Sequence, residues 1–298
     1  GPAPRPPMNL APSWFASKEL ALSRSRHPDP KAPKGRGRPR DRRAPVEVTG
    51  LRPHEHGVPG ERAVVELLRA APRRVRRLLV ETGKTFDEVV TLAAAGGVSI
   101  EEVEREALEA LVGPGLARGV LAIAEPPRRW DLADLLDRED GPRTRRGHRI
   151  IVALDGVLDP HNLGAVIRSV EFFGGSGVVW AQDRSAPLSP AAVRASAGAS
   201  ERLPLAQVTN LARAIEQVKA HGEGTWWVAG TVVDEGQPIH AFAEDPPSNL
   251  LLILGSEERG MRRLTRERCD FSLTIDRGGE LGSLNVSAAA AVALALLA

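Results

Sequence analysis

Two patterns of hydrophobic residues alternate along the chain from residue 149 onward. Continuous apolar runs, such as residues 150–157, are typical of strands buried on both faces of a parallel sheet. Segments such as residues 211–222 repeat apolar residues every three to four positions, as a helix with one buried face does. The alternation predicts an α/β fold with a mostly parallel sheet covered on both faces. We predict strands at 150–157, 177–181, 225–232, 249–257 and 271–276, and helices at 163–174, 191–197, 211–222 and from about 286 onward.

A second alternation of helix and strand patterns precedes this one, and Pro and Gly residues separate its segments. It predicts a small α/β domain of about 80 residues over 46–127, a plausible size for a domain. Residues 128–148 are charged and contain a Gly-Pro break, so we expect a short helix and a linker there, followed by a domain over 149–298. Within the small domain we predict helices at 61–71, 86–97 and 104–113, and strands at 75–81, 98–103 and 119–125.

Charge is distributed unevenly along the chain. The 298 residues carry a net charge of +2, but residues 1–45 hold eleven Lys/Arg and three Asp/Glu. This Pro/Gly-rich segment has too few apolar residues to fold alone, so we predict a disordered basic tail. Its cations suit contact with RNA phosphates; a merely solvated tail or a transit peptide are the alternatives. A run of four arginines at 73–77 has the same two interpretations, a phosphate grip or a solvated face.

Cysteine content and hydropathy narrow the class of protein. Cys269 is the single cysteine, which excludes an intramolecular disulfide and a cysteine-based zinc cluster. No apolar run has the character of a membrane span, and no secretory leader is recognisable, so we expect a protein of a reducing compartment, the cytoplasm. His161 has no second histidine nearby in the sequence, so we predict no metal site.

Polar residues stand where strands end and helices begin. Asn162 opens one helix-forming run, and Ser283 and Asn285 open the last one. Helix starts carry unpaired N–H groups and a partial positive charge, which suits ligands and catalytic groups; simple helix capping is the alternative. Glu257 lies in a Gly-rich loop after a strand, where parallel sheets bind ligands, although a surface turn would look the same.

Three motifs follow one another along the chain: N-x-G-x-x-x-R at residues 162–168, G-x-E-x-x-G at residues 255–260 after an apolar strand, and S-L-N-V-S at residues 283–287 before a terminal helix. They resemble the motifs of the SpoU/TrmH family of S-adenosylmethionine-dependent RNA 2′-O-methyltransferases, within the SPOUT superfamily. The segments between them resemble the bacterial branch that methylates guanosine in 23S rRNA, and residues 50–125 resemble the substrate-binding domain of that branch. The matching positions are Asn162, Gly164 and Arg168, then Gly255, Glu257 and Gly260, then Ser283, Leu284, Asn285, Val286 and Ser287.

The resemblance implies a fold, a cofactor and partners. It implies a C-terminal trefoil knot, a homodimer with the active site at its interface, large-subunit rRNA as substrate, and S-adenosylmethionine as methyl donor. The cofactor's adenosine would rest on the backbone at Gly255, Ile275 and Leu284. Asp276 and Arg277 replace a Pro-Met pair of the family, which predicts a looser loop and weaker cofactor binding.

The resemblance also gives roles to individual side chains. Arg168 is the family's catalytic candidate. A guanidinium with a pKa above about 12 is a poor base, so we expect Arg168 to clamp the substrate and stabilise a developing alkoxide, with a substrate phosphate accepting the proton. Asn162 and Glu257 would orient Arg168 or the ribose, and Ser283 and Asn285 would shape the pocket. A buried salt bridge without catalytic role is the alternative for Arg168 and Glu257.

Other functions are compatible with the same sequence. A non-catalytic RNA-binding factor in ribosome assembly could have this fold, and the Asp276-Arg277 departure favours it. An rRNA methyltransferase that confers antibiotic resistance, or an organellar homologue, would share every motif.

Overall fold

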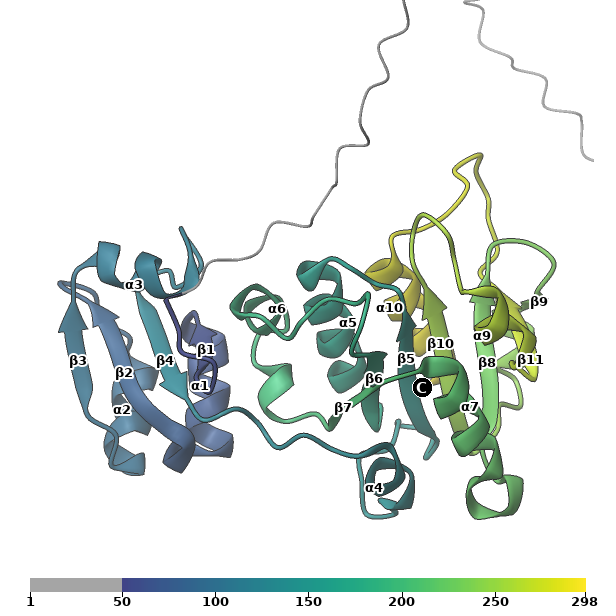
Figure 1. The fold of residues 1–298 in the computed structure, drawn as a ribbon, viewed down its shortest axis with the longest axis horizontal. Coiled ribbons are helices and arrows are strands. Elements are labelled where there is room, and N and C mark those ends of the chain that lie inside the picture. Colours follow the sequence, from purple (N-terminus) through teal and green to yellow (C-terminus); the bar gives the residue numbers. More distant parts are fainter. Residues whose placement is uncertain (1–49) are drawn as a thin grey trace, which may run out of the picture. The chain divides into compact units, whose positions relative to one another are not determined.

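The computed structural model describes residues 50–298 (Figure 1). The basic tail predicted at residues 1–45 lies outside the described residues. In this part of the chain the strands form two sheets, one of four strands and one of seven.

The first sheet has the strand order β1-β4-β2-β3. Only β2 and β3 run parallel, and the other neighbours are antiparallel. Helices α1 and α2 pack on one face, and α3 packs on the other against Leu121 and Ile123. These elements are β1 (His56–Pro59), α1 (Glu61–Ala70), β2 (Val75–Glu81), α2 (Asp87–Gly96), β3 (Ile100–Val103), α3 (Arg105–Val112) and β4 (Val120–Ala124).

The second sheet is parallel throughout, as the continuous apolar runs predict, with the order β7-β6-β5-β10-β8-β11-β9. Strand β5 pairs with β6 on one side and with β10 on the other, so the chain leaves it in one direction first and returns to its other side later. Such a switch in strand order leaves a crevice at the carboxyl ends, where ligands bind. The strands are β5 (Arg149–Asp155), β6 (Gly177–Ala181), β7 (Leu205–Val208), β8 (Trp227–Val232), β9 (Gln237–Pro238), β10 (Asn249–Gly255) and β11 (Phe271–Thr274).

Helices cover both faces of this sheet, so its strands are apolar on both sides. In β5, Val152 and Leu154 join the core beneath α5, α8 and α10, whereas Ile151 and Ala153 join the core beneath α4 and α7. The helices are α4 (Leu132–Asp137), α5 (Pro160–Phe172), α6 (Pro190–Ala195), α7 (Leu211–Ala220), α8 (Ile239–Phe242), α9 (Arg263–Glu267) and α10 (Val286–Leu297). The α/β class is therefore confirmed, and so is the short helix predicted within 128–148.

Five elements were not predicted from the pattern, and all of them are short. Strands β1, β7 and β9 have four, four and two residues, and helices α8 and α9 have four and five. A segment of this length contains too few positions for an apolar period to show. Strands β1, β7 and β9 also lie at sheet edges, where Pro is tolerated, as in β1 and β9.

A buried carboxylate joins segments far apart in the sequence. The Glu201 side chain is fully buried, and its two oxygens accept hydrogen bonds from His56 Nε2 and Arg74 Nη1, both at 2.9 Å. Burial alone would raise the pKa of Glu201, but the hydrogen bond and charge of His56, together with Arg74, hold that pKa below its ordinary value. The ionised carboxylate is therefore part of the folded structure.

Candidate functional site

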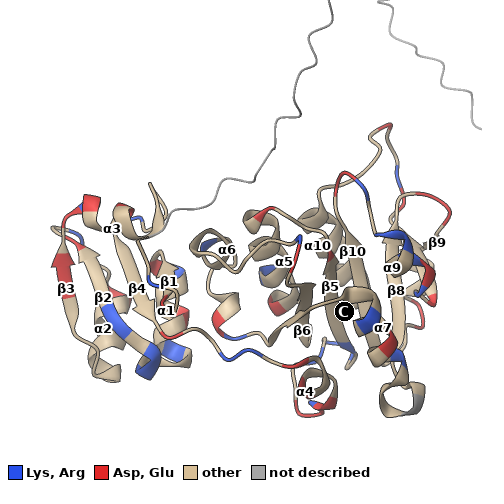
Figure 2. Ribbon diagram, viewed as in Figure 1, with Lys and Arg blue, Asp and Glu red and all other residues tan. Residues whose placement is uncertain are grey.

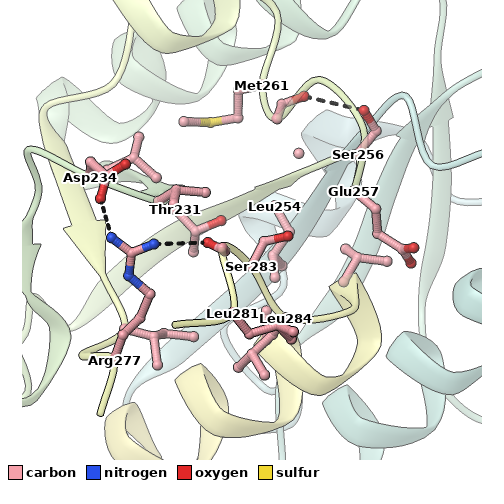
Figure 3. Close-up of a pocket in the computed structure, with 18 of the residues that line it drawn as sticks. Thr231, Asp234, Leu254, Ser256, Glu257, Met261, Arg277, Leu281, Ser283 and Leu284 are labelled. Atoms are coloured by element: carbon pink, nitrogen blue, oxygen red, sulfur yellow. Dashed lines mark hydrogen bonds and ion pairs between the residues drawn. The ribbon is translucent and has the colours of Figure 1, made fainter. Parts of the chain in front are cut away.

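A pocket of about 850 Å³ opens at the carboxyl ends of β8, β10 and β11. Its walls are loops: residues 231–235 after β8, residues 254–261 after β10, and residues 275–284 between β11 and α10 (Figure 3). The position is the one that a parallel sheet predicts for a ligand site. Two predicted loops, the Gly-rich one after β10 and the Ser-Leu-Asn segment, meet here.

Glycines shape this pocket in two ways. A Cβ on Gly255 would stand 2.1 Å from the carbonyl carbon of Gly260 and 2.2 Å from the nitrogen of Met261, so only glycine allows the loop to fold back on itself. Gly278, Gly279 and Gly282 also line the pocket, and a Cβ on any of them would meet nothing within 4 Å. Their exposed backbone is therefore free to contact a ligand.

Three predicted site residues form a closed hydrogen-bond network. Asn162 Nδ2 donates to Glu257 Oε1 at 2.7 Å, and Asn285 Nδ2 donates to the same oxygen at 2.6 Å and to Asn162 Oδ1 at 3.0 Å. The orientation of Asn285 follows from helix capping, because its Oδ1 accepts the Ser287 N–H at 2.8 Å and the Ser287 hydroxyl at 2.6 Å. Asn285 therefore caps α10 and contacts Glu257 with the same side chain.

The three predicted cofactor residues lie on the pocket wall, together with Ser283, which was predicted to shape the pocket. Gly255, Ile275, Ser283 and Leu284 all line it. Ile275 also packs against the core beneath α10, whereas Leu284 leaves almost half of its surface exposed. An apolar side chain exposed inside a pocket is a natural contact for a flat or apolar ligand.

Arg168 is not brought to this pocket. It lies on α5, its side chain is exposed, and it makes no hydrogen bond or ion pair with another residue of 50–298. The alternative of a buried salt bridge between Arg168 and Glu257 is therefore wrong. The structure unites Asn162, Glu257 and Asn285, and it leaves Arg168 free to meet something outside this chain's own pocket.

The Asp276-Arg277 departure is accommodated by two ion pairs. Asp276 Oδ2 lies 2.7 Å from His240 Nδ1 of α8, and Arg277 Nη2 lies 2.6 Å from Asp234 Oδ1 in the loop after β8. Arg277 Nη1 also donates to the carbonyl of Gly282 at 3.2 Å. The loop is thus tethered at both replaced positions instead of being left loose.

Sequence reasoning missed Asp155, which ends β5. Its carboxylate is fully buried, accepts the backbone N–H of Arg262 at 2.7 Å, and lies 3.3 Å from Arg262 Nη1. It therefore holds the end of the Gly-rich loop against the sheet. A carboxylate that ends a run of five apolar residues was the signal in the sequence, because burying a charge is costly unless it is paired.

The arginine run at 73–77 is mostly engaged within the protein. Arg77 binds both oxygens of Glu101, Arg76 pairs with Glu125, and Arg74 reaches Glu201. In Figure 2 the basic start of β2 lies beside the acidic β3. The hydrogen bond to Glu101 raises the pKa of Arg77 above its ordinary value. Among these four arginines, only Arg73 has no polar partner in the described part of the chain.

Residues 50–298 contain neither a candidate membrane-spanning helix nor a candidate metal-binding cluster. No helix in residues 50–298 is long and apolar enough to cross a membrane. Within the same residues, no group of three or more His, Cys, Asp and Glu side chains could hold a metal ion.

Two family models match the chain, one over the first sheet and the other over the second. Residues 58–130 match the RNA 2′-O ribose methyltransferase substrate-binding domain, and residues 149–295 match the SpoU rRNA methylase family. A 23S rRNA (guanosine-2′-O-)-methyltransferase, RlmB, of Pseudomonas syringae pv. tomato is 39% identical over 241 residues, covering 79% of this chain and 92% of the relative. This chain belongs to the SpoU rRNA methylase family.

Other members of the SpoU family extend the likeness. RlmB of Escherichia coli is 36% identical over 242 residues, covering 79% of this chain and 94% of the relative. Among solved structures, the SpoU methyltransferase AviRb from Streptomyces viridochromogenes, crystallised with the cofactor AdoMet, matches with a TM-score of 0.65 at 26% identity, over 82% of this chain and 89% of that one. The SpoU motifs of this chain are thus the segments that build the pocket and its hydrogen-bond network.

Proposed function

We propose that this chain transfers a methyl group from S-adenosylmethionine to the ribose 2′-hydroxyl of a guanosine in 23S rRNA. The observation that carries the proposal is the Asn162–Glu257–Asn285 network, which ties one residue from each SpoU motif together beside a pocket. The activity named for the RlmB relatives, at 36–39% identity over most of both chains, supports the substrate.

The residues of the pocket fit the cofactor. Open backbone at Gly278 and Gly279 and the exposed Leu284 suit an adenosine, and Gly255 and Ile275 complete the wall. When bound, this cofactor supplies a methyl group that is already activated by the positive charge of its sulfonium. The protein then has to position a 2′-hydroxyl in line with that group, and positioning alone can supply much of the rate acceleration.

Arg168 would contact the RNA substrate and would not stabilise the folded structure. Its guanidinium stays protonated at neutral pH, so it donates hydrogen bonds and stabilises negative charge on the 2′-oxygen as the proton leaves. A phosphate of the RNA accepts that proton. Asn162 and Glu257, held by Asn285, orient the ribose at the pocket edge.

A homodimer would bring Arg168 to a second pocket. Phe172 of α5 is 78% exposed, and Val292 and Leu296 of α10 are 37% and 38% exposed, on two helices that pack together. Large apolar side chains exposed close together mark interaction surfaces. Covering them with a second copy would bury this surface and place the free arginine beside the partner's cofactor. The C-terminal trefoil knot belongs to the same proposal.

The other regions follow from this assignment. We propose that residues 46–127 bind rRNA, that residues 128–148 link them to the methyltransferase domain at 149–298, and that the protein acts in the cytoplasm. The basic residues 1–45 would add attraction to RNA.

The proposal is tested by measuring cofactor binding first and methyl transfer to rRNA second. Calorimetry with S-adenosylmethionine, together with labelled-methyl transfer to unmethylated 23S rRNA, should give a binding isotherm and incorporation into ribose. RNA binding without any cofactor binding would favour the non-catalytic assembly factor, which the charged Asp276-Arg277 pair makes the second candidate.

A further inference from the structure

Arg277 and Asp234 place two opposite charges side by side on the wall of the pocket. They come from different loops, one after β11 and one after β8, and both line the pocket. Their side chains are 43% and 67% exposed, so the pair is accessible from the pocket mouth. Figure 3 shows the Arg277 side chain reaching across the loops toward Asp234.

Each member of this pair keeps unused hydrogen-bonding capacity. A guanidinium has five N–H donors, and Arg277 uses Nη2 for Asp234 and Nη1 for the Gly282 carbonyl. Asp234 accepts through Oδ1, and its Oδ2 makes no hydrogen bond to another residue in 50–298. The pair therefore offers free donors next to a free acceptor.

The backbone that carries Arg277 is held from the other side. Its neighbour Asp276 pairs with His240 of α8 at 2.7 Å, and Gly282, to which Arg277 donates, lies just before the Ser283-Leu284 segment. The loop that carries Arg277 is thus tethered at Asp276 and at Gly282 before any ligand arrives. A ligand that binds to groups already held in place causes a smaller loss of conformational entropy, because few side chains still have to be ordered.

A free donor next to a free acceptor matches one chemical group closely, the zwitterion of an α-amino acid. Its carboxylate needs donors and its ammonium needs an acceptor, and both groups are attached to the same carbon, so neighbouring Arg277 and Asp234 can bind them together. An exposed ion pair contributes little by itself, so a ligand can share or replace the contact between the two side chains at small cost. An adenosine without the amino-acid group would leave both charges unused.

We propose that Arg277 and Asp234 bind the amino-acid end of the methyl donor, with Arg277 on the carboxylate and Asp234 on the ammonium group. The inference rests on the proposed function and assigns a purpose to the Asp276-Arg277 departure. The charged pair makes this chain's pocket selective for cofactors that carry the methionine or homocysteine end. The alternative is that Arg277 only braces the two loops that it joins.

The test compares two ligands that share the adenosine and the sulfur but differ in the amino-acid group. S-adenosylhomocysteine has that group and 5′-methylthioadenosine lacks it. Calorimetry on the full chain should show that Arg277→Met weakens S-adenosylhomocysteine about ten- to a hundredfold, as expected for losing charge-assisted hydrogen bonds, and leaves methylthioadenosine within about twofold. Asp234→Asn should shift the same ratio in the same direction.

Controls separate recognition from bracing and folding. Arg263→Met makes the same change at an exposed arginine of α9 that pairs with Glu267 outside the pocket, and it should alter neither affinity. If Arg277→Met weakened the binding of both ligands equally, Arg277 would only brace the loops. If it changed neither affinity, Arg277 would not contact the ligand. Either result overturns this inference and leaves the proposed function standing. If the unaltered protein binds neither ligand, the proposed function falls and the inference falls with it.

Discussion

Asn285 and Glu257 are 28 residues apart in the sequence, and their side chains meet at 2.6 Å where α10 begins. The same asparagine caps α10 through its Oδ1, so one side chain both starts the helix and aims its amide at the carboxylate. This dual use explains why the last SpoU motif stands at a helix start. It also allows the two roles to be separated by substitution.

Asn285→Asp should keep the helix cap and lose activity. Aspartate caps as well as asparagine, but it removes the donor and sets a second carboxylate against Glu257. Asn285→Ala should lose activity and also about 1 kcal/mol of unfolding free energy. Denaturant unfolding and methyl transfer to rRNA measure the two effects. Turnover of Asn285→Asp equal to that of the unaltered protein would show that the network is only structural.

Arg168→Ala should leave the fold and the cofactor affinity intact. Because its side chain is exposed and has no polar partner in residues 50–298, the unfolding free energy should change by no more than about 0.5 kcal/mol. Methyl transfer should fall at least about a hundredfold, the usual cost of removing a group that stabilises developing negative charge. Arg213→Ala, an exposed arginine on α7, serves as the matched control and should retain full transfer.

Gly255→Ala should disrupt the pocket through the backbone. The new methyl group would overlap the Gly260 carbonyl carbon at 2.1 Å, so the loop must move, at a cost of about 3 kcal/mol or more. Cofactor binding should be lost in calorimetry and the melting temperature should fall. Gly278→Ala, where a Cβ meets open space, should keep the melting temperature. Normal cofactor binding by Gly255→Ala would contradict the assigned role of this loop.

Glu201→Gln should reduce stability at neutral pH and should reduce it less in acid. The pKa of Glu201 is lowered in the folded protein, so its ionised form contributes stability above its ordinary pKa of 4.5, and this contribution is lost as pH falls through the folded pKa. Breaking such a buried pair costs about 3 kcal/mol. Unfolding by urea at pH 7 and again near pH 4 should therefore show a difference between the two proteins that shrinks in acid. An equal difference at both pH values would contradict the ionised pair with His56 and Arg74.

The larger elements could be predicted because burial leaves a clear pattern. Strand β5 is apolar at successive positions since both of its faces are covered, and α7 shows one periodic face. The two-residue β9 and the four-residue α8 have no such pattern, since their conformation depends on neighbours in space. Local sequence does not contain that information.

The residues of the hydrogen-bond network could be named from the sequence, but their contacts could not. The family resemblance singled out Asn162 and Asn285, yet 123 positions separate them, and no periodicity relates the starts of two helices so far apart in the sequence. The arginine run was misleading for a related reason. Arg74 finds its carboxylate 127 residues away, so the sequence showed an excess of positive charge where the folded protein has an ion pair.

The most direct test of the account maps the methyl group itself. The full chain is incubated with unmethylated 23S rRNA and S-adenosylmethionine, and 2′-O-methyl positions are read along the RNA, with Arg168→Ala in parallel. The account predicts methylation of a guanosine ribose at one position and loss of the signal with Arg168→Ala. Cofactor binding without any ribose methylation, or a signal that survives in Arg168→Ala, would contradict it.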